Sequence, residues 1–125
     1  MSLFGYPDKN PTNRFCLNPT GKPSTPAKEK PVFIEYEPPR SGEYRPFHHA
    51  RLVVGAPGAD KTLTQGSQGW VYDRYGAKKQ PQLSPVRKER YGGLPQGWKF
   101  KFMGWSNLTD KGIQDRVDGV WSSMS

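Results

Sequence analysis

The stretch GWKFKFMGWSNLTDKGIQDRVDGVWSSM (Gly97–Met124) carries the longest regular pattern of apolar residues in the chain. At its start, Trp98, Phe100 and Phe102 alternate with lysines, the period of a half-buried β-strand. After Gly104 the period lengthens to that of a helix. The apolar residues of this helical stripe are Ile113, Val117, Val120, Trp121 and Met124. The stretch therefore predicts a strand followed by a short C-terminal α-helix.

The predicted helix has a start signal but little intrinsic stability. Asn107 can cap it, and Asp110 favours the positive end of the helix dipole. Gly112 and Gly119 lie inside it, and each costs about 1 kcal/mol relative to alanine. An isolated helix of this length is marginal in water. We therefore expect the helix to form only when its apolar stripe is docked, on the aromatic face of the preceding strand and on a partner.

The composition of the 125-residue chain argues against a large hydrophobic core. Only 33% of the residues are hydrophobic, and 14 glycines and 13 prolines interrupt regular structure. The aromatic fraction of 13% is nevertheless too high for a fully disordered chain. We therefore predict a mostly irregular extended chain with few short β-strands, one short C-terminal α-helix and no autonomous large core. Such a chain would become ordered on the surface of a partner.

Local composition divides the chain into three predicted segments. Residues 1–30 hold many prolines, which predicts an extended leader. Residues 31–96 are expected to form an extended segment with short strands and Gly/Pro turns. Residues 97–125 are the C-terminal strand–helix anchor.

Short strands are predicted within the middle segment. Pro31–Tyr36 and Trp70–Tyr75 are rich in β-branched and aromatic residues, which favours strands. Phe47–Val54 is a further apolar run that fits either a strand or a short helical turn. Ala77–Arg90 is basic and contains prolines, so we expect it to be a loop or tether.

The formal net charge of +8 predicts an acidic partner surface, such as nucleic acid, an anionic membrane face or an acidic protein lattice. The single cysteine, Cys16, rules out an internal disulfide framework and suggests a reducing compartment. No apolar run reaches the length of a membrane span, and the first residues show no secretory signal. We therefore expect a cytoplasmic location.

The segment LVVGAPGADKT (Leu52–Thr62) has the spacing of a phosphate-binding loop of the form G-x-x-x-x-G-K-[ST]. Gly55 and Lys61-Thr62 are in place, but Asp60 replaces the second glycine. A carboxylate there repels phosphate, and the residues that follow are poor helix formers, so no helix end is expected to hold the phosphate. We favour a Gly-Pro surface turn over a nucleotide site.

Catalytic and metal chemistry find little support in the sequence. His48 and His49 are the only histidines, and neighbouring residues of a strand point to opposite faces. Together with Cys16 they are too few for a structural zinc site. Neither an activated serine or cysteine nor a pair of carboxylates suggests catalysis. We therefore expect a protein that is not an enzyme and has no cofactor and no metal.

Aromatic and apolar side chains spread along the whole chain are the candidate partner-binding residues. Basic residues flank many of them, as in surfaces that bind single-stranded nucleic acid or acidic protein grooves. Asp73 and Glu89 interrupt the basic runs and would repel phosphates, which favours a protein partner. The candidate anchors are Phe4, Tyr6, Phe15, Tyr36, Tyr44, Trp70, Tyr72, Tyr75, Tyr91, Trp98, Phe100, Phe102, Trp105, Ile113, Val117 and Trp121.

In compositional style the chain resembles the microtubule inner proteins of ciliary and flagellar doublets. The segments that carry this resemblance are FCLNPTGKPSTPAKEKP (Phe15–Pro31), YEPPRSGEYRPF (Tyr36–Phe47) and YDRYGAKKQP (Tyr72–Pro81). The resemblance implies a non-enzymatic staple that lies extended on an acidic lattice in the axoneme, part of the cytoskeleton of the cilium. Its partners would be tubulin and neighbouring structural proteins, bound by many weak anchors that tethering makes additive.

Two alternatives remain open. The chain could be an accessory protein of a ribonucleoprotein such as the ribosome, with nucleic acid as the partner and binding that falls steeply with salt. It could also be a peripheral accessory subunit of a mitochondrial respiratory complex. The cellular location of the tagged protein would separate the three interpretations.

Overall fold

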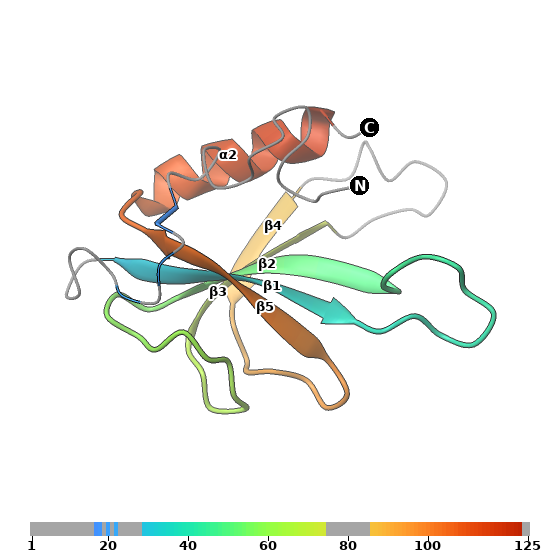
Figure 1. Cartoon of the computed structure of the whole chain (residues 1–125). Helices are drawn as coiled ribbons and strands as arrows, with labels where there is room; N and C mark the ends of the chain where they lie inside the picture. Colours follow the sequence, from blue (N-terminus) through green and yellow to red (C-terminus); the bar gives the residue numbers. More distant parts are fainter. Residues whose placement is uncertain (1–16, 19, 21, 23–28, 75–85, 124–125) are drawn as a thin grey trace.

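The computed structural model describes residues 17, 18, 20, 22, 29–74 and 86–123. This part of the chain forms a sheet and one helix (Figure 1). The elements are β1 (Lys30–Glu37), β2 (His49–Gly55), β3 (Gly69–Arg74), β4 (Val86–Arg90), β5 (Lys99–Ser106) and α2 (Asp110–Ser123).

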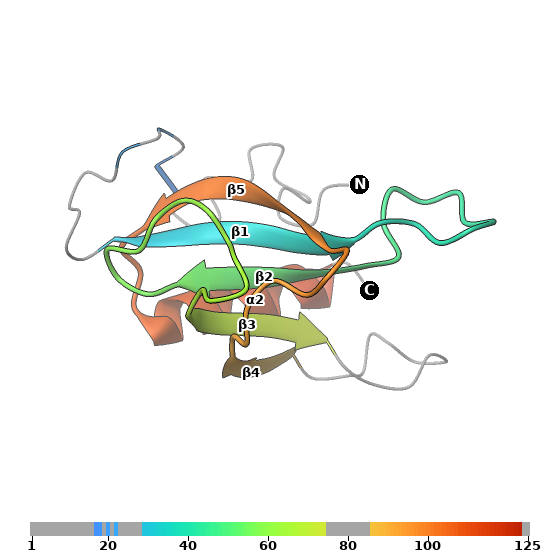
Figure 2. The ribbon, with the colours of Figure 1, turned by 90° about the horizontal axis from the view of Figure 1, so that it is seen from below.

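The strands form a single antiparallel sheet in the order β4-β3-β2-β1-β5, which Figure 2 shows from below. Strands β1 to β4 follow one another as a meander, whereas β5 returns to pair with the other side of β1. Phe33 in β1 therefore lies opposite Val53 of β2 on one side and opposite Phe102 of β5 on the other. β1 is the strand that joins the C-terminal unit to the rest of the sheet.

The expectation of a mostly irregular extended chain without an autonomous core is wrong. The structure has a five-stranded sheet with a buried apolar cluster on each face. The low hydrophobic fraction was misleading, because a strand needs an apolar side chain at only every second position to cover one face of a sheet. The prolines also interrupt less than their number suggests, since all the described ones except Pro31 lie in connections between strands.

One face of the sheet is covered by α2, as Figure 1 shows. Ile113 and Val117 are buried there, which confirms docking for the part of the helical stripe whose side chains are described. Met124 and the side chains of Val120 and Trp121 lie outside the described structure. The expected docking surface was wrong, because Phe100 and Phe102 pack in the cluster of the opposite face. Ile113 and Val117 instead pack in a cluster with Leu17, Val32, Leu52, Val54 and Tyr72.

The helix begins at Asp110, and its cap is Thr109 rather than the predicted Asn107. The Thr109 hydroxyl accepts a hydrogen bond from the backbone N–H of Gly112 at 3.1 Å, the geometry of an N-cap. Asp110 in the first turn complements the helix dipole, as expected. The docked stripe and this cap offset the cost of the glycines inside the helix.

The opposite face of the sheet is covered by two connections, residues 56–68 and 91–98, which lie on the side away from α2 in Figure 1. Phe33 lies at the centre of this face. Its ring meets the rings of Phe100 and Phe102 edge-on, with centroids 5.9 and 5.7 Å apart. Leu63 and Tyr91 from the two connections complete the buried cluster.

The short strands predicted at Pro31–Tyr36 and Trp70–Tyr75 are confirmed as β1 and β3. The Phe47–Val54 run, which fitted either a strand or a helical turn, contributes to the strand β2. The expectation that Ala77–Arg90 is entirely loop is wrong, because Val86–Arg90 forms β4. This strand lies at the edge of the sheet and only Val86 and Lys88 are half-buried, so it needs little apolar sequence. Charged edge strands of this kind also discourage pairing with other sheets.

Part of the predicted leader is attached to the outer edge of β5. Asn18 and Trp105 exchange two backbone hydrogen bonds, at 2.8 and 2.9 Å. Leu17 is buried beside them. Gly104 makes this approach possible, because a Cβ there would lie 2.7 Å from the carbonyl oxygen of Asn18. The remainder of the leader lies outside the described residues, apart from residues 20, 22, 29 and 30.

The sheet predicts a strong response to substitution of Gly69. Its φ is 144°, and an added Cβ would lie 2.2 Å from the carbonyl oxygen of Val54 on the neighbouring strand. We expect Gly69→Ala to lower the free energy of unfolding by more than about 2 kcal/mol, measured by urea denaturation. The matched control is Gly92→Ala, where no atom lies within 4 Å of the added Cβ. Equal stability of the two variants would contradict the close packing of β2 and β3.

Candidate functional site

The connection between β1 and β2 projects beyond the sheet, as both Figure 1 and Figure 2 show. We call residues 38–48 the β1–β2 arm. The strand ladder ends at the pair Glu37 and His49, so the arm starts where the sheet stops. Hairpin connections are commonly about two to five residues long, and long connections on a rigid scaffold often carry function. The arm is therefore the first candidate for a functional site.

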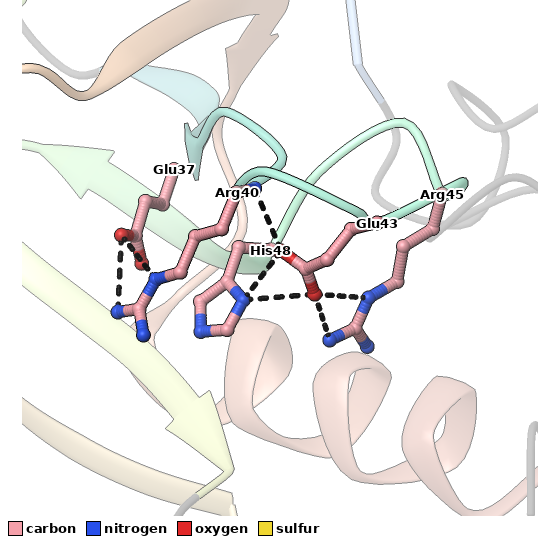
Figure 3. Close-up of polar contacts among 5 residues, drawn as sticks. All are labelled: Glu37, Arg40, Glu43, Arg45 and His48. Carbon is pink, nitrogen blue, oxygen red and sulfur yellow. Dashed lines mark hydrogen bonds and ion pairs between the residues drawn. The ribbon is translucent and has the colours of Figure 1, made fainter.

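The carboxylate of Glu43 holds the arm together, as Figure 3 shows. One oxygen accepts a hydrogen bond from the backbone N–H of Arg40 at 2.7 Å. The other accepts from Nε and Nη2 of Arg45, at 3.0 and 2.5 Å. Nδ1 of His48 lies 2.8 Å from the first oxygen. A single side chain thus ties together both ends of the arm.

The base of the arm is fixed by Glu37, the last residue of β1. Its carboxylate accepts hydrogen bonds from Nε and Nη2 of Arg40, both at 3.3 Å (Figure 3). Its carbonyl oxygen accepts the backbone N–H of His48 at 2.8 Å. Gly42 makes the turn at the tip, with a φ of 87° that a side chain would disfavour. The arm is a defined structure rather than an open loop.

We call the Glu43 carboxylate and its partners Arg40, Arg45 and His48 the Glu43 hub. Tyr44 follows Glu43 in the chain and is fully exposed. Among the residues that the structure describes, Tyr44 is the only large hydrophobic residue that is exposed. Tyrosine is enriched among the residues that dominate binding energy at protein interfaces, because its ring is large and has few rotamers to lose. A rigid arm that presents such a ring is suited to filling a pocket on a partner.

The charges of the arm compensate one another. Glu37 pairs with Arg40, and Glu43 pairs with Arg45 and His48. The hydrogen bond from the Arg40 N–H, followed by the Arg45 guanidinium, lowers the pKa of Glu43 to about 2. The hub is therefore ionised at all physiological pH values, and the tip offers a neutral surface around Tyr44.

A second polar cluster lies on the face opposite α2, where sequence reasoning placed none. Glu35 has no exposed surface, and its carboxylate accepts hydrogen bonds from Nε of Arg51 and from the hydroxyl of Tyr91. Burial, together with that hydrogen bond, raises the pKa of Tyr91. A signal was present, because Glu35 stands two residues after Phe33 and must share its face.

The same face carries a pair formed by His49 and Asp73. Nε2 of His49 lies 2.8 Å from both carboxylate oxygens of Asp73. The hydrogen bond to Asp73 raises the pKa of His49 above its ordinary value of 6.5. Trp98 covers the cluster, with its ring 6.0 Å from that of His49 and 4.8 Å from the guanidinium carbon of Arg51. These contacts hold the 91–98 connection against the sheet.

A third polar group surrounds Trp70 at the start of β3. The ammonium of Lys88 lies 4.4 Å from the ring centroid, and the guanidinium carbon of Arg90 lies 5.9 Å from it. Asp110 at the start of α2 is 2.9 Å from Lys30 and 3.4 Å from Lys88. The hydrogen bond from Lys30 lowers the pKa of Asp110.

The structure divides the predicted partner-binding residues by burial. Several lie inside the fold, where they stabilise the core and present no surface to a partner: Tyr72, Tyr91, Trp105, Ile113 and Val117.

Others are half-buried and bound to neighbours within the chain: Tyr36, Trp70, Trp98, Phe100 and Phe102. The structure does not gather these side chains on one surface, because Trp70 packs against the cluster under α2 while Phe100 and Phe102 lie on the opposite face.

The remaining predicted anchors lie outside the described structure. Phe4, Tyr6, Phe15 and Tyr75 are not among the described residues, and of Trp121 only its place in α2 is described. Tyr44 is thus the predicted anchor that the structure presents on the surface.

The Leu52–Thr62 segment forms the turn that the sequence favoured. β2 ends at Gly55, and Ala59 donates a backbone hydrogen bond to the carbonyl of Ala56 at 3.0 Å. The Asp60 carboxylate accepts the N–H of Lys61 at 2.7 Å, so it occupies a donor that a phosphate-binding loop would offer to its ligand. The next regular element is β3 rather than a helix.

Within the described parts of the chain, no group of three or more His, Cys, Asp or Glu side chains is placed to hold a metal ion. Among the same residues, no helix has the length and apolar character needed to cross a membrane.

Comparisons with known proteins give no family assignment. No protein-family model matches the chain, and it has no significant match among curated proteins or solved structures.

The arm predicts a carboxyl group with unusual acidity. We expect Glu43 to titrate near pH 2. The stabilisation of the arm by the ionised carboxylate should be fully present above the ordinary carboxyl pKa of 4.5 and be lost as the pH falls through about 2. The titration can be followed by carbon NMR of the side-chain carboxyl. Arg45→Gln should move the pKa upward, because it removes one of the groups that favour the charged form. A wild-type value near 4.5 would contradict the hub.

The His49–Asp73 pair predicts a pH dependence of opposite sign. Because the pKa of His49 is raised in the folded state, the stabilisation is fully present below pH 6.5 and is lost as the pH rises through the higher, folded value. We expect proton NMR to give His49 a pKa above 6.5, and Asp73→Asn to remove the increase. Asp60→Asn, at an exposed position, is the control and should leave His49 unchanged. A His49 pKa that does not respond to Asp73→Asn would contradict the pairing.

Proposed function

We propose that this protein is a non-enzymatic structural subunit that joins a larger protein assembly through its β1–β2 arm. The observation that carries the proposal is the full exposure of Tyr44 on an arm whose conformation is fixed by Glu43. Because the arm is ordered before it binds, less conformational entropy is lost on docking. Tyr44 would enter a pocket of the neighbouring subunit, and the compact sheet would keep the arm at a fixed angle.

The neutral charge of the arm favours a protein as the direct contact. Glu37 and Glu43 would repel phosphates, and the guanidinium groups of Arg40 and Arg45 are already paired with them. Protein interfaces are centred on aromatic side chains in pockets with few unpaired charges, which is what the tip of the arm presents.

The net charge of +8 supports an acidic host for this subunit, because it attracts the protein before the arm makes its short-range contacts. We propose the microtubule doublet of the axoneme as that host, in line with the compositional resemblance. One of the resembling segments, Tyr36–Phe47, covers most of the arm. The mode of action changes from an extended staple to a compact clip, since the described residues form a folded sheet.

The proposal is tested by co-sedimentation with purified axonemal doublets that have been stripped of their inner proteins. We expect the wild-type chain to bind and Tyr44→Ala to weaken binding at least tenfold, since a central tyrosine contributes about 2 kcal/mol or more at an interface. The melting temperature should not change, because Tyr44 is fully exposed. Lys99→Ala, at an exposed position on β5, is the control and should bind almost normally.

Other outcomes would reject specific parts of the proposal. Equal binding of wild type and Tyr44→Ala would remove the arm from the interface. Release by nuclease and by moderate salt would instead support the ribonucleoprotein interpretation. Location of the tagged chain in mitochondria would support an accessory role in a respiratory complex and reject the axonemal host.

A further inference from the structure

A cavity of about 510 Å³ opens where the ends of β2 and β4 and the starts of β1 and β3 meet the start of α2. Its volume lies within the range of small-molecule sites, about 300 to 1,000 Å³. Ala56 and Pro57 of the turn after β2 form one wall, and Trp70 and Tyr91 form another. The β1–β2 arm takes no part in it, so this cavity is separate from the proposed docking surface.

Positive charge predominates in this cavity. Lys30 and Arg90 line it, and Lys88 contacts both Trp70 and Asp110, which are also lining residues. Among the lining residues, the cations Lys30 and Arg90 are matched by a single carboxylate, that of Asp110. The excess of positive charge would be reduced by an anionic ligand.

Lys30 and Lys88 are held in place by their neighbours, whereas the exposed Arg90 guanidinium lies near the Trp70 ring. Nζ of Lys30 donates to Asp110 at 2.9 Å and to the carbonyl oxygen of Leu108 at 3.3 Å, which uses two of its three donors. The Trp70 ring attracts the Lys88 ammonium and the Arg90 guanidinium. Positioned cations of this kind bind an anion at a lower entropic cost than mobile ones do.

Arg90 is the cation best placed to receive a ligand. No carboxylate is paired with its guanidinium within the part of the chain that the structure describes. A guanidinium binds phosphate oxygens through two parallel hydrogen bonds, and a nearby ammonium adds charge without directional demands. An inorganic phosphate would fill only a part of the volume, so the remainder calls for an organic body against Ala56, Pro57 and Tyr91.

We propose that this cavity binds a small phosphorylated molecule of about nucleotide size, with its phosphate at Arg90 and its body against Ala56, Pro57 and Tyr91. The ligand is a small molecule rather than a nucleic acid, because a single cavity of limited volume accepts it and no row of stacking aromatics follows the β4 edge among the described residues.

The experiment is an NMR titration of the full, isotopically labelled chain, read at the indole N–H of Trp70 and assigned with Trp70→Phe. The probes are ADP, ribose 5-phosphate, inorganic phosphate and unphosphorylated adenosine. We expect saturable shifts with ADP or ribose 5-phosphate at a Kd below about 1 mM, weaker binding of inorganic phosphate and none of adenosine. Tighter binding of ADP than of ribose 5-phosphate identifies a nucleotide, and the reverse identifies a sugar phosphate.

Matched variants separate a site from general charge attraction. Arg90→Gln should weaken binding at least tenfold, which is the loss expected for a charge-assisted bidentate contact. Lys101→Gln removes the same charge from an exposed position on β5 and should change the Kd by less than about twofold. Both positions are exposed, so neither variant should unfold the chain.

The proposal is overturned if neither ADP nor ribose 5-phosphate gives a saturable shift. It is also overturned if Arg90→Gln and Lys101→Gln weaken binding equally, or if inorganic phosphate binds as tightly as the organic phosphates. Binding of a single-stranded oligonucleotide without binding of the small probes would assign the basic edge to nucleic acid instead. None of these results depends on docking of the β1–β2 arm.

Discussion

A carboxylate without exposed surface, that of Glu35, lies within β1, the strand between β2 and β5, and much of the architecture follows from it. An unpaired buried charge costs several kcal/mol, so Glu35 must be met by partners on the same face of the sheet. Arg51 lies directly opposite it on β2, and Tyr91 reaches it from the 91–98 connection. A slip of one residue between β1 and β2 would move Arg51 to the face under α2 and leave Glu35 unpaired. This charge requirement therefore fixes the register and closes the connection over the sheet.

The β1–β2 arm depends on that register. Counting outward from the Glu35–Arg51 pair, the ladder ends at Glu37 and His49, and the arm begins there with its geometry already set. Glu37 then anchors Arg40, and the Glu43 hub gathers the residues beyond it. The exposed ring of Tyr44 is thus connected to the buried core through a short series of hydrogen bonds and pairings. The conformation of the arm is therefore set from the core outward.

The amount of the fold that the sequence predicts depends on the element. The alternation at Phe100 and Phe102 and the helical spacing of Ile113 and Val117 predict β5 and α2 because each pattern is local. Which strand pairs with which is set by contacts far apart in the chain, so the composition led to an extended chain instead of a sheet. β4 was missed because an edge strand of mostly charged residues carries no apolar period.

In the candidate site, too, local features could be predicted from the sequence and contacts between distant residues could not. The residue type alone was enough to make Tyr44 a candidate anchor. The sequence could not predict that Tyr44 is exposed while Tyr72 and Tyr91 are buried, because all three are tyrosines beside charged residues. The Glu43 hub is sequence-local but needs the turn at Gly42 to bring its partners together. The cavity beside Trp70 joins residues from Lys30 to Asp110 and has no local signature.

The pairing of β1 with β5 has a consequence for biosynthesis. On the ribosome, the first strand emerges early, but the edge it offers to β5 stays open until residues 99–106 have left the exit tunnel. The helix that covers one face emerges later still. During that interval the nascent polypeptide exposes an unpaired strand and an uncovered apolar face, the features that chaperones recognise and that promote aggregation. Final closure of this sheet is therefore a late event that must wait for β5 and α2 to be synthesised.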